Sequence, residues 1–123
     1  MKEIPFTQIM LNQTRNHNKI HTLRPKRYGN NGDVLKIKNH DEYIKLITVQ
    51  KIPLHIVSKY LYKCEGCLTP DHFIAVWETI HQERGYVPED EYYGHFYIYL
   101  GGECGEIGCV VEDVQSLIVH DTG

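Results

Sequence analysis

The spacing of apolar and polar residues predicts a short helix and then several strands in the first half of the chain. Apolar residues at a helical period mark residues 6–16 as a helix. An extended segment at 19–24, a turn rich in Asn and Gly, and an alternating segment at 34–38 together predict a β-hairpin. Two segments with many β-branched residues, 43–49 and 54–57, are expected to pair with this hairpin as strands, with the proline between them marking an edge or a bulge.

The second half of the chain contains the clearest helix signal. Thr69 is a favourable N-cap, and Pro70 suits the first helical position. Apolar residues then follow at i, i+3, i+4 and i+7, with Trp77 on this apolar face and therefore expected in the core. We expect Gly85 to end the helix.

The segment after this helix predicts the main core strand. Residues 95–100 alternate strictly, with Phe96, Ile98 and Leu100 on one face and tyrosines on the other. Short apolar groups at 110–111 and 117–119 would add one or two terminal strands. Strands outnumber helices, so the fold class expected is α+β, with a small barrel-like sheet rather than a βαβ repeat.

Composition is consistent with one ordinary globular domain. The chain has 123 residues, 41% hydrophobic and 24% charged, with no internal repeat. No apolar run approaches the roughly 18 residues that cross a bilayer, and the N-terminal residues do not resemble a signal peptide. The expectation is a cytoplasmic protein with no membrane association, and no protein partner is indicated.

Charge is divided along the chain although the net charge is only -3. Between Arg15 and Lys38 there are seven basic residues and one acid, whereas from Gly85 to the end there are eight acids and no Lys or Arg. Such a division predicts a bounded surface that attracts phosphate. The alternative is a solvated basic loop opposite an acidic tail.

The segment Lys19-Ile-His-Thr22-Leu-Arg24, followed eight residues later by Gly32-Asp33, resembles the ASCH superfamily, whose fold is PUA-like. Members of that family have a short helix, a Lys-x-x-Thr-x-Arg stretch, a Gly-Asp pair before a strand, and a Glu-Gly pair before a helix. Glu65-Gly66 stands where the last motif is expected. The resemblance covers about residues 4–100. It implies a small PUA-like β-barrel with flanking short helices over residues 1–100. Residues 101–123 lie outside the resemblance and are expected to form a C-terminal extension packed on the same domain.

The nearest functional model in the ASCH superfamily is the group of small amidohydrolases that remove the acetyl group of N4-acetylcytidine. By position, this resemblance implies Lys19, Thr22 and Glu65 as the catalytic set, with Arg24 lining the same pocket. Other substrate-binding residues expected around this segment are His21, Lys26 and Arg27. No cofactor is needed for this chemistry. The sequence has His17 where the family usually has glycine and Ile20 where it often has threonine, and these departures bear on the substrate.

The residue types suit an amide hydrolysis. A threonine hydroxyl needs a base to become a nucleophile, and a buried lysine can be that base because burial lowers its pKa. Glu65 could protonate the leaving amine, and Arg24 could hold a carbonyl or phosphate oxygen. In a regular strand Lys19 and Thr22 would point to opposite faces, so a turn or bulge must lie between them.

A second interpretation is a non-catalytic RNA- or nucleotide-binding module. Lys19 and Arg24 would then only bind phosphate, Thr22 would cap a turn, and Glu65 would be an exposed acid near a helix start. Tyr28, together with His17 and His21, would offer stacking surfaces for bases.

The cysteines predict a further site of a different kind. Cys64 and Cys67 have the spacing of a zinc knuckle, and Cys104 and Cys109 form a second pair about 40 residues later. The four thiolates could bind a structural zinc ion, with His72 as an additional ligand. The alternative is that the cysteines are buried small apolar side chains.

Overall fold

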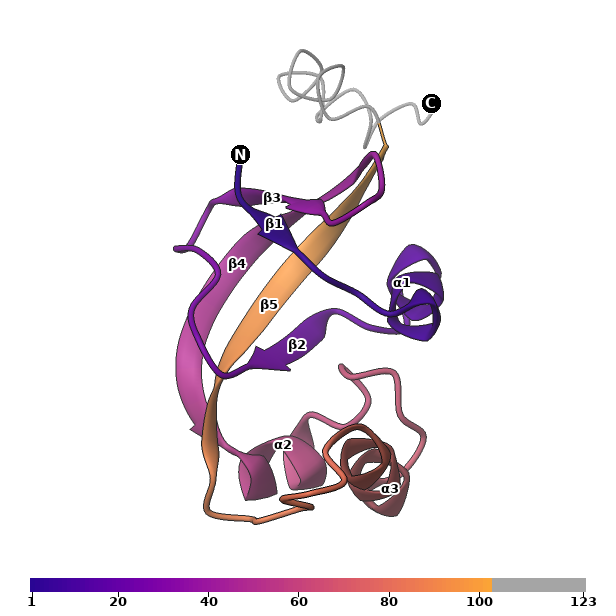
Figure 1. Cartoon of the computed structure of the whole chain (residues 1–123), viewed down its shortest axis with the longest axis vertical. Coiled ribbons are helices and arrows are strands. Elements are labelled where there is room, and N and C mark those ends of the chain that lie inside the picture. Colours follow the sequence, from indigo (N-terminus) through magenta and orange to yellow (C-terminus); the bar gives the residue numbers. More distant parts are fainter. Residues whose placement is uncertain (103–123) are drawn as a thin grey trace.

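The computed structural model describes residues 1–102, which form one five-stranded sheet with three short helices (Figure 1). The strands are β1 (Glu3–Ile4), β2 (His21–Arg24), β3 (Val34–Ile37), β4 (Glu42–Pro53) and β5 (Glu91–Gly102), and the helices are α1 (Gln8–Arg15), α2 (Leu54–Tyr60) and α3 (Pro70–Ile80). The order across the sheet is β1-β3-β4-β5-β2, with β1 parallel to β3 and the other pairs antiparallel. Figure 1 shows α2 and α3 at one end of the sheet and α1 beside β2. The expected α+β class is confirmed.

The expected barrel is wrong, because the sheet is open. Its two edges are β1, with two residues, and β2, with four. Strands this short supply too few ladder hydrogen bonds to pair with each other and close the sheet. The C-terminal extension is predicted to begin at residue 101, but Gly101 and Gly102 are the end of β5 and pair with β4. The rest of the extension and the predicted terminal strands lie after residue 102, outside the described residues.

The predicted hairpin between 19–24 and 34–38 is also wrong. β2 pairs with β5, and β3 pairs with β4. The turn residues between them connect to β4 instead, since the Gly32 amide donates to the carbonyl of Leu46 and the Leu46 amide donates to Asp33. The predicted turn at residues 30–33 is present. The strand that pairs with β3 is β4, which comes later in the chain, and not β2, which comes before the turn.

Residues 54–57 form the start of α2 instead of the predicted strand. β4 runs unbroken to Pro53, and the chain turns there into the helix. The free amides of Leu54 and His55 donate to the carbonyls of Asp90 and Pro88, so the loop before β5 satisfies the helix start. Tertiary hydrogen bonds and burial of the helix override the local preference of β-branched residues for strands.

The predicted helix start at Thr69 and Pro70 is confirmed, and the Thr69 hydroxyl accepts a hydrogen bond from the His72 amide as the N-cap. Helix α3 ends at Ile80, before the expected stop at Gly85. Gly85, with a φ of 72°, lies in the turn that follows, where its amide donates to the carbonyl of His81.

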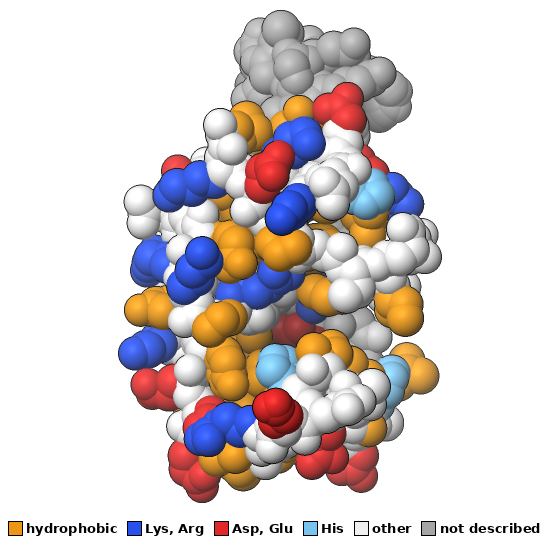
Figure 2. Space-filling view, viewed as in Figure 1, with side chains coloured by type: hydrophobic (Ala, Val, Ile, Leu, Met, Phe, Trp, Pro, Cys, Tyr) orange, Lys and Arg blue, Asp and Glu red, His pale blue; other side chains and the backbone are white. Residues whose placement is uncertain are grey.

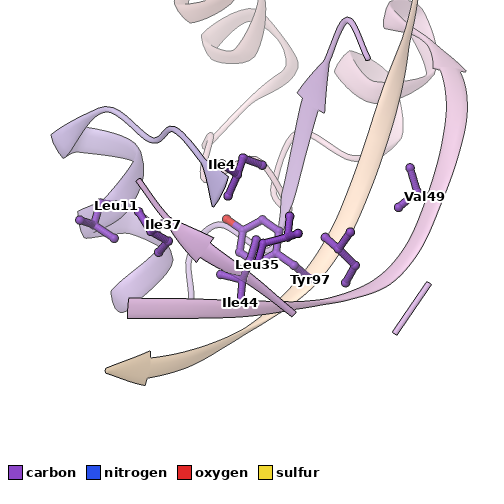
Figure 3. Close-up of a cluster of buried hydrophobic side chains, with 8 residues drawn as sticks. Ile4, Leu11, Leu35, Ile37, Ile44, Val49 and Tyr97 are labelled. Carbon is purple, nitrogen blue, oxygen red and sulfur yellow. The ribbon is translucent and has the colours of Figure 1, made fainter. Parts of the chain in front are cut away.

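Two apolar clusters form the core. The first, drawn in Figure 3, joins α1 to the inner face of the sheet and comprises Ile4, Leu11, Leu35, Ile37, Ile44, Leu46, Val49 and Tyr97. The alternation predicted for β5 is confirmed, but its core face is the tyrosine face: Tyr97 is 3% exposed and its hydroxyl is 2.6 Å from Thr14 Oγ1, whereas Ile98 is 51% exposed. The second cluster packs α2 against α3 and contains the expected core residue Trp77.

Helices long and apolar enough to cross a membrane were not found among residues 1–102.

Candidate functional site

A cavity of about 500 Å³ lies between α1, β2 and α3. Its size is within the range of small-molecule sites. The polar side chains of the predicted site that line it are Lys19, Thr22, Arg24 and Glu65. An apolar wall faces them, made by Phe6, Ile9, Met10, Phe73, Val76, Trp77 and Ile80. The structure therefore gathers four predicted site residues around one cavity.

Lys19 reaches the cavity because it lies just before β2 and not within it. After α1 the chain reverses through His17, whose φ is 62°, and the amides of Asn18 and Lys19 both donate to the carbonyl of Gln13. Lys19 then forms an isolated antiparallel bridge with Glu65. This reversal lies before Lys19, and not between Lys19 and Thr22 where the sequence reasoning expected a turn or bulge; between them the amides of Ile20 and His21 both donate to the carbonyl of Cys64.

Glu65 lies in the connection between α2 and α3, where the chain also reverses. Its amide donates to the carbonyls of Leu61 and Tyr62, and Gly66 follows with a φ of 84°, a conformation that favours glycine. The carbonyl of the preceding Cys64 accepts from the amides of Ile20 and His21. Backbone hydrogen bonds thus hold this connection against the start of β2.

The Glu65 carboxylate is buried and bonded through both oxygens. Lys19 Nζ donates to Glu65 Oε1 at 2.7 Å and to the His21 carbonyl at 2.8 Å, and His21 Nδ1 contacts Glu65 Oε2. The side chains of Lys19, His21 and Glu65 are only 6%, 1% and 7% exposed. Burial acts to raise the pKa of Glu65, but Lys19 and His21 together hold that pKa below its ordinary value. Glu65 is therefore ionised and paired with Lys19 in this structure, not the exposed acid of the second interpretation.

Thr22 is buried in β2, 1% exposed, and its hydroxyl is hydrogen-bonded to Arg24. Arg24 Nε donates to Thr22 Oγ1 at 3.2 Å. Within residues 1–102 Thr22 Oγ1 makes no hydrogen bond with Lys19 or Glu65. The three residues share the cavity, with Thr22 coupled to Arg24.

Arg24 carries a positive charge with an incomplete set of partners. Its guanidinium lies 5.3 Å from the ring centre of Phe6 and 5.6 Å from that of Tyr28. Burial lowers the pKa of Arg24. Its Nη2 is buried and has no hydrogen-bond partner in the described part of the chain. An unsatisfied buried donor costs roughly 1–3 kcal/mol, so an acceptor oxygen on a ligand would stabilise this side chain.

His21, expected to bind substrate, lies behind Glu65 and does not line the cavity. Its ring packs 4.3 Å from that of Phe96. Gly94 leaves room for it, since a Cβ there would stand 2.5 Å from His21 Nε2. The geometry makes His21 a neighbour of Glu65 and not of a ligand.

Lys26 and Arg27 also lie outside the cavity wall, beside tyrosine rings. Lys26 Nζ is 5.2 Å from the ring centre of Tyr28, and the Arg27 guanidinium is 5.9 Å from that of Tyr93. Sequence reasoning did not single out Tyr93 for a role at the site. It also did not foresee the apolar wall, because Trp77 was assigned only to the core. The signal for that wall was present as the apolar face of the predicted helix.

The cysteines of the described residues are both reduced. Cys67 is buried in the cluster with Phe73 and Trp77, and Cys64 is half-buried. Burial raises the pKa of both thiols. No group of three or more His, Cys, Asp or Glu side chains placed to hold a metal was found in residues 1–102. The zinc prediction also needs Cys104 and Cys109, which lie outside the described residues, so it stays a prediction.

Comparison with known proteins finds a likeness in structure. No family model matches the chain, and no curated protein matches it in sequence. The fold is similar to a high-resolution crystal structure of an ASCH domain from Lactobacillus crispatus JV V101, with a TM-score of 0.61 and 12% sequence identity over 80% of this chain and 79% of that chain. At this identity the likeness shows the fold alone, and the chain has an ASCH-domain fold.

Proposed function

We propose that the protein is an amidohydrolase that removes an N-acyl group from a nucleobase, such as the acetyl group of N4-acetylcytidine. The observation that carries this proposal is that Lys19, Thr22, Arg24 and Glu65 line one cavity of about 500 Å³. The cavity has room for a nucleoside, and its aromatic wall suits a planar base. The resemblance of these four positions to the ASCH motifs supports the same conclusion.

The buried Lys19–Glu65 pair supplies both an acid and a base. A bound nucleobase excludes water from the cavity, and two charges become more costly relative to two neutral groups as their surroundings lose water. Transfer of one proton along the 2.7 Å hydrogen bond from Lys19 Nζ to Glu65 Oε1 would give a neutral amine and a carboxylic acid. These are the protonation states that the reaction requires.

Thr22 would then act as the nucleophile. Its oxygen attacks the acyl carbon while its proton passes to Lys19, and the Arg24 Nε donor, 3.2 Å from Thr22 Oγ1, stabilises charge on that oxygen. The bond between the acyl carbon and N4 breaks, and N4 takes the proton of Glu65. Lys19 and Glu65 thereby regain their resting charges. Water hydrolyses the acyl-threonine ester, which releases the carboxylic acid and restores Thr22.

The test is hydrolysis of N4-acetylcytidine by the purified protein, followed as release of cytidine by chromatography. Thr22→Val keeps the shape of the side chain and removes the nucleophile, and Lys19→Met removes the base, a change expected to lower kcat/KM about 10²–10⁴-fold. Thr48→Val, at a half-buried threonine of β4, is the matched control and should keep activity. Absence of cytidine release at high enzyme concentration would refute the proposal.

A second candidate is a non-catalytic module that binds RNA or a nucleotide. It is favoured by one observation, that Lys19 and Glu65 satisfy each other while Thr22 is bonded to Arg24, so the resting site holds no activated nucleophile. The two candidates differ in one measurement. A binding module would bind cytidine derivatives and release no product, in the parent protein and in Thr22→Val alike.

A further inference from the structure

Four cations on β2, on β4 and in the connection that follows β2 have no carboxylate partner among the described residues. Arg24, Lys26, Arg27 and Lys51 form no salt bridge with any residue between 1 and 102. The other two arginines each form a bidentate salt bridge, Arg15 with Glu42 and Arg84 with Asp90. Cations left uncompensated in one place attract an anion from outside the fold.

Two tyrosines organise these cations into a continuous surface. The ring centre of Tyr28 has the Arg24 guanidinium at 5.6 Å and Lys26 Nζ at 5.2 Å. The ring of Tyr93 has the Arg27 guanidinium at 5.9 Å and Lys51 Nζ at 5.7 Å. We call these six residues the cation–tyrosine strip.

The strip begins in the cavity wall and crosses the sheet. Arg24 on β2 is paired in register with Tyr93 on β5, and Tyr93 is paired with Lys51 on β4. Two strand spacings, roughly 10 Å, therefore separate the backbone of Arg24 from that of Lys51. Since Arg24 also lines the cavity, a ligand in the cavity that extends past Arg24 meets the strip directly.

Arg27 is held in place without losing its charge. It donates to the carbonyls of Gly29 and Val49 and to the Asn30 side chain, and all three acceptors are neutral. Asp33, in the same connection, accepts from the Asn30 amide and forms no ion pair within the described residues. The guanidinium is thus fixed in position and remains available to an anion.

Lys and Arg side chains predominate around the strip. Figure 2 shows them gathered over β4 and the connection from β2 to β3, while Asp and Glu side chains lie toward both ends of the molecule, including the end near α2 and α3. An anionic ligand in the cavity is therefore directed toward the strip and away from that end.

We infer that the ligand is a phosphate-bearing nucleotide whose base enters the cavity and whose phosphate groups lie on the cation–tyrosine strip. This inference rests on the proposed nucleobase site and adds to it the class of ligand, a nucleotide instead of a free nucleoside. A mononucleotide and a single-stranded RNA present the same phosphate chemistry. Tyrosine rings between the cations also suit neighbouring bases of a strand, since base stacking tolerates any sequence.

The test compares binding of cytidine, cytidine 5′-monophosphate and a short oligocytidylate to the whole protein by calorimetry at low salt. None of these ligands has an acyl group, so the result does not depend on hydrolysis. Cytidine 5′-monophosphate should bind at least about tenfold more tightly than cytidine, and the advantage should shrink as salt is raised. A further gain for the oligocytidylate identifies a strand as the ligand, and no further gain identifies a mononucleotide.

Variants locate the phosphate on the strip. Lys26→Ala/Lys51→Ala removes two exposed cations and should abolish most of the phosphate advantage, with the salt slope for the oligocytidylate falling by about 1.4. Lys38→Ala/Lys45→Ala removes the same charge from exposed positions off the strip and should leave the advantage intact. Equal loss in both variants, or equal affinity of the parent protein for cytidine and its monophosphate, would overturn the inference. The proposed function fails separately, if the protein releases no cytidine from N4-acetylcytidine.

Discussion

The two ends of β2 carry cations in opposite electrostatic surroundings. Before its first residue, Lys19 is buried and bonded to the Glu65 carboxylate and to a backbone carbonyl. At its last residue, Arg24 lies between two aromatic rings with one buried nitrogen unbonded in the described structure. The first charge is satisfied by the fold and the second is not. At the Lys19 end of the cavity the charge is paired within the protein, whereas at the Arg24 end a ligand would supply the missing hydrogen-bond acceptor.

The difference implies that the two ends of β2 contribute differently to the stability of the fold. A buried ion pair adds little net stability compared with apolar packing, but removing one partner leaves a charge that water cannot reach. An already unpaired cation has no such partner to lose. Mutations at the Lys19 end should therefore destabilise the fold, and mutations at the Arg24 end should mainly weaken ligand binding.

The largest expected effect follows from Glu65→Leu. It leaves Lys19 charged and buried, which should lower the free energy of unfolding by about 3–5 kcal/mol in urea denaturation. Glu3→Gln, in the exposed pair with Lys36, is the control and should cost less than about 1 kcal/mol. Lys19→Met/Glu65→Leu should recover most of the loss, because no unpaired charge remains. Failure of the double variant to recover would mean that packing, and not charge, is what Glu65 supplies.

The same double variant has a signature in acid. The pKa of Glu65 is lower in the folded protein than its ordinary value of 4.5, so below that pH the unfolded chain binds more protons than the folded one. Stability from Glu65 is thus present above about pH 4.5 and lost as the pH falls through the folded pKa. The parent protein should lose more stability than Lys19→Met/Glu65→Leu over this acid range.

An intermediate effect on stability is expected at Gly94, which leaves room for the ring of His21, the neighbour of Glu65. Gly94→Ala would place a Cβ 2.5 Å from His21 Nε2 and 3.1 Å from Ile52 Cγ2, and overpacking of this kind costs about 1–3 kcal/mol. Thermal or urea unfolding measures it. In a His21→Ala background the same substitution should cost much less. An equal cost in both backgrounds would assign the strain to Ile52.

Sequence reasoning succeeded where the signal was local. The N-cap and proline at residues 69–70 located α3, and the alternation at 95–100 located β5. The four motif positions Lys19, Thr22, Arg24 and Glu65 do line one cavity.

The failures in assigning strands and their partners were questions of long-range pairing. The preference of residues 54–57 for a strand was overridden by hydrogen bonds that the Leu54 and His55 amides donate to the loop at 88–90, and the turn at 30–33 could not reveal which strand would pair beside it. The contacts of Tyr93 with cations exist only because β2, β5 and β4 lie side by side. Register between strands distant in sequence is not encoded in any one of them.

The smallest effect on stability is expected from Arg24→Met. This variant is the strongest test of the contrast between the two ends of β2, because it should weaken ligand binding with little change in stability. It removes the hydrogen bond to Thr22 and the contacts with the Phe6 and Tyr28 rings, but it also removes an unsatisfied buried donor, and a thioether packs well against aromatic rings. The free energy of unfolding should change by less than about 1 kcal/mol. Affinity for cytidine 5′-monophosphate should nevertheless fall at least about tenfold, since Arg24 joins the cavity to the strip.

Arg27→Met is the matched control for this variant, because Arg27 donates to three neutral acceptors where Arg24 has a buried, unbonded nitrogen. Its loss removes the hydrogen bonds to the carbonyls of Gly29 and Val49, so it should cost more stability than Arg24→Met. If Arg24→Met were instead the more damaging of the two, Arg24 would hold the fold as Lys19 does. The unbonded nitrogen would then be a tolerated cost of packing, and the contrast between the two ends of β2 would disappear.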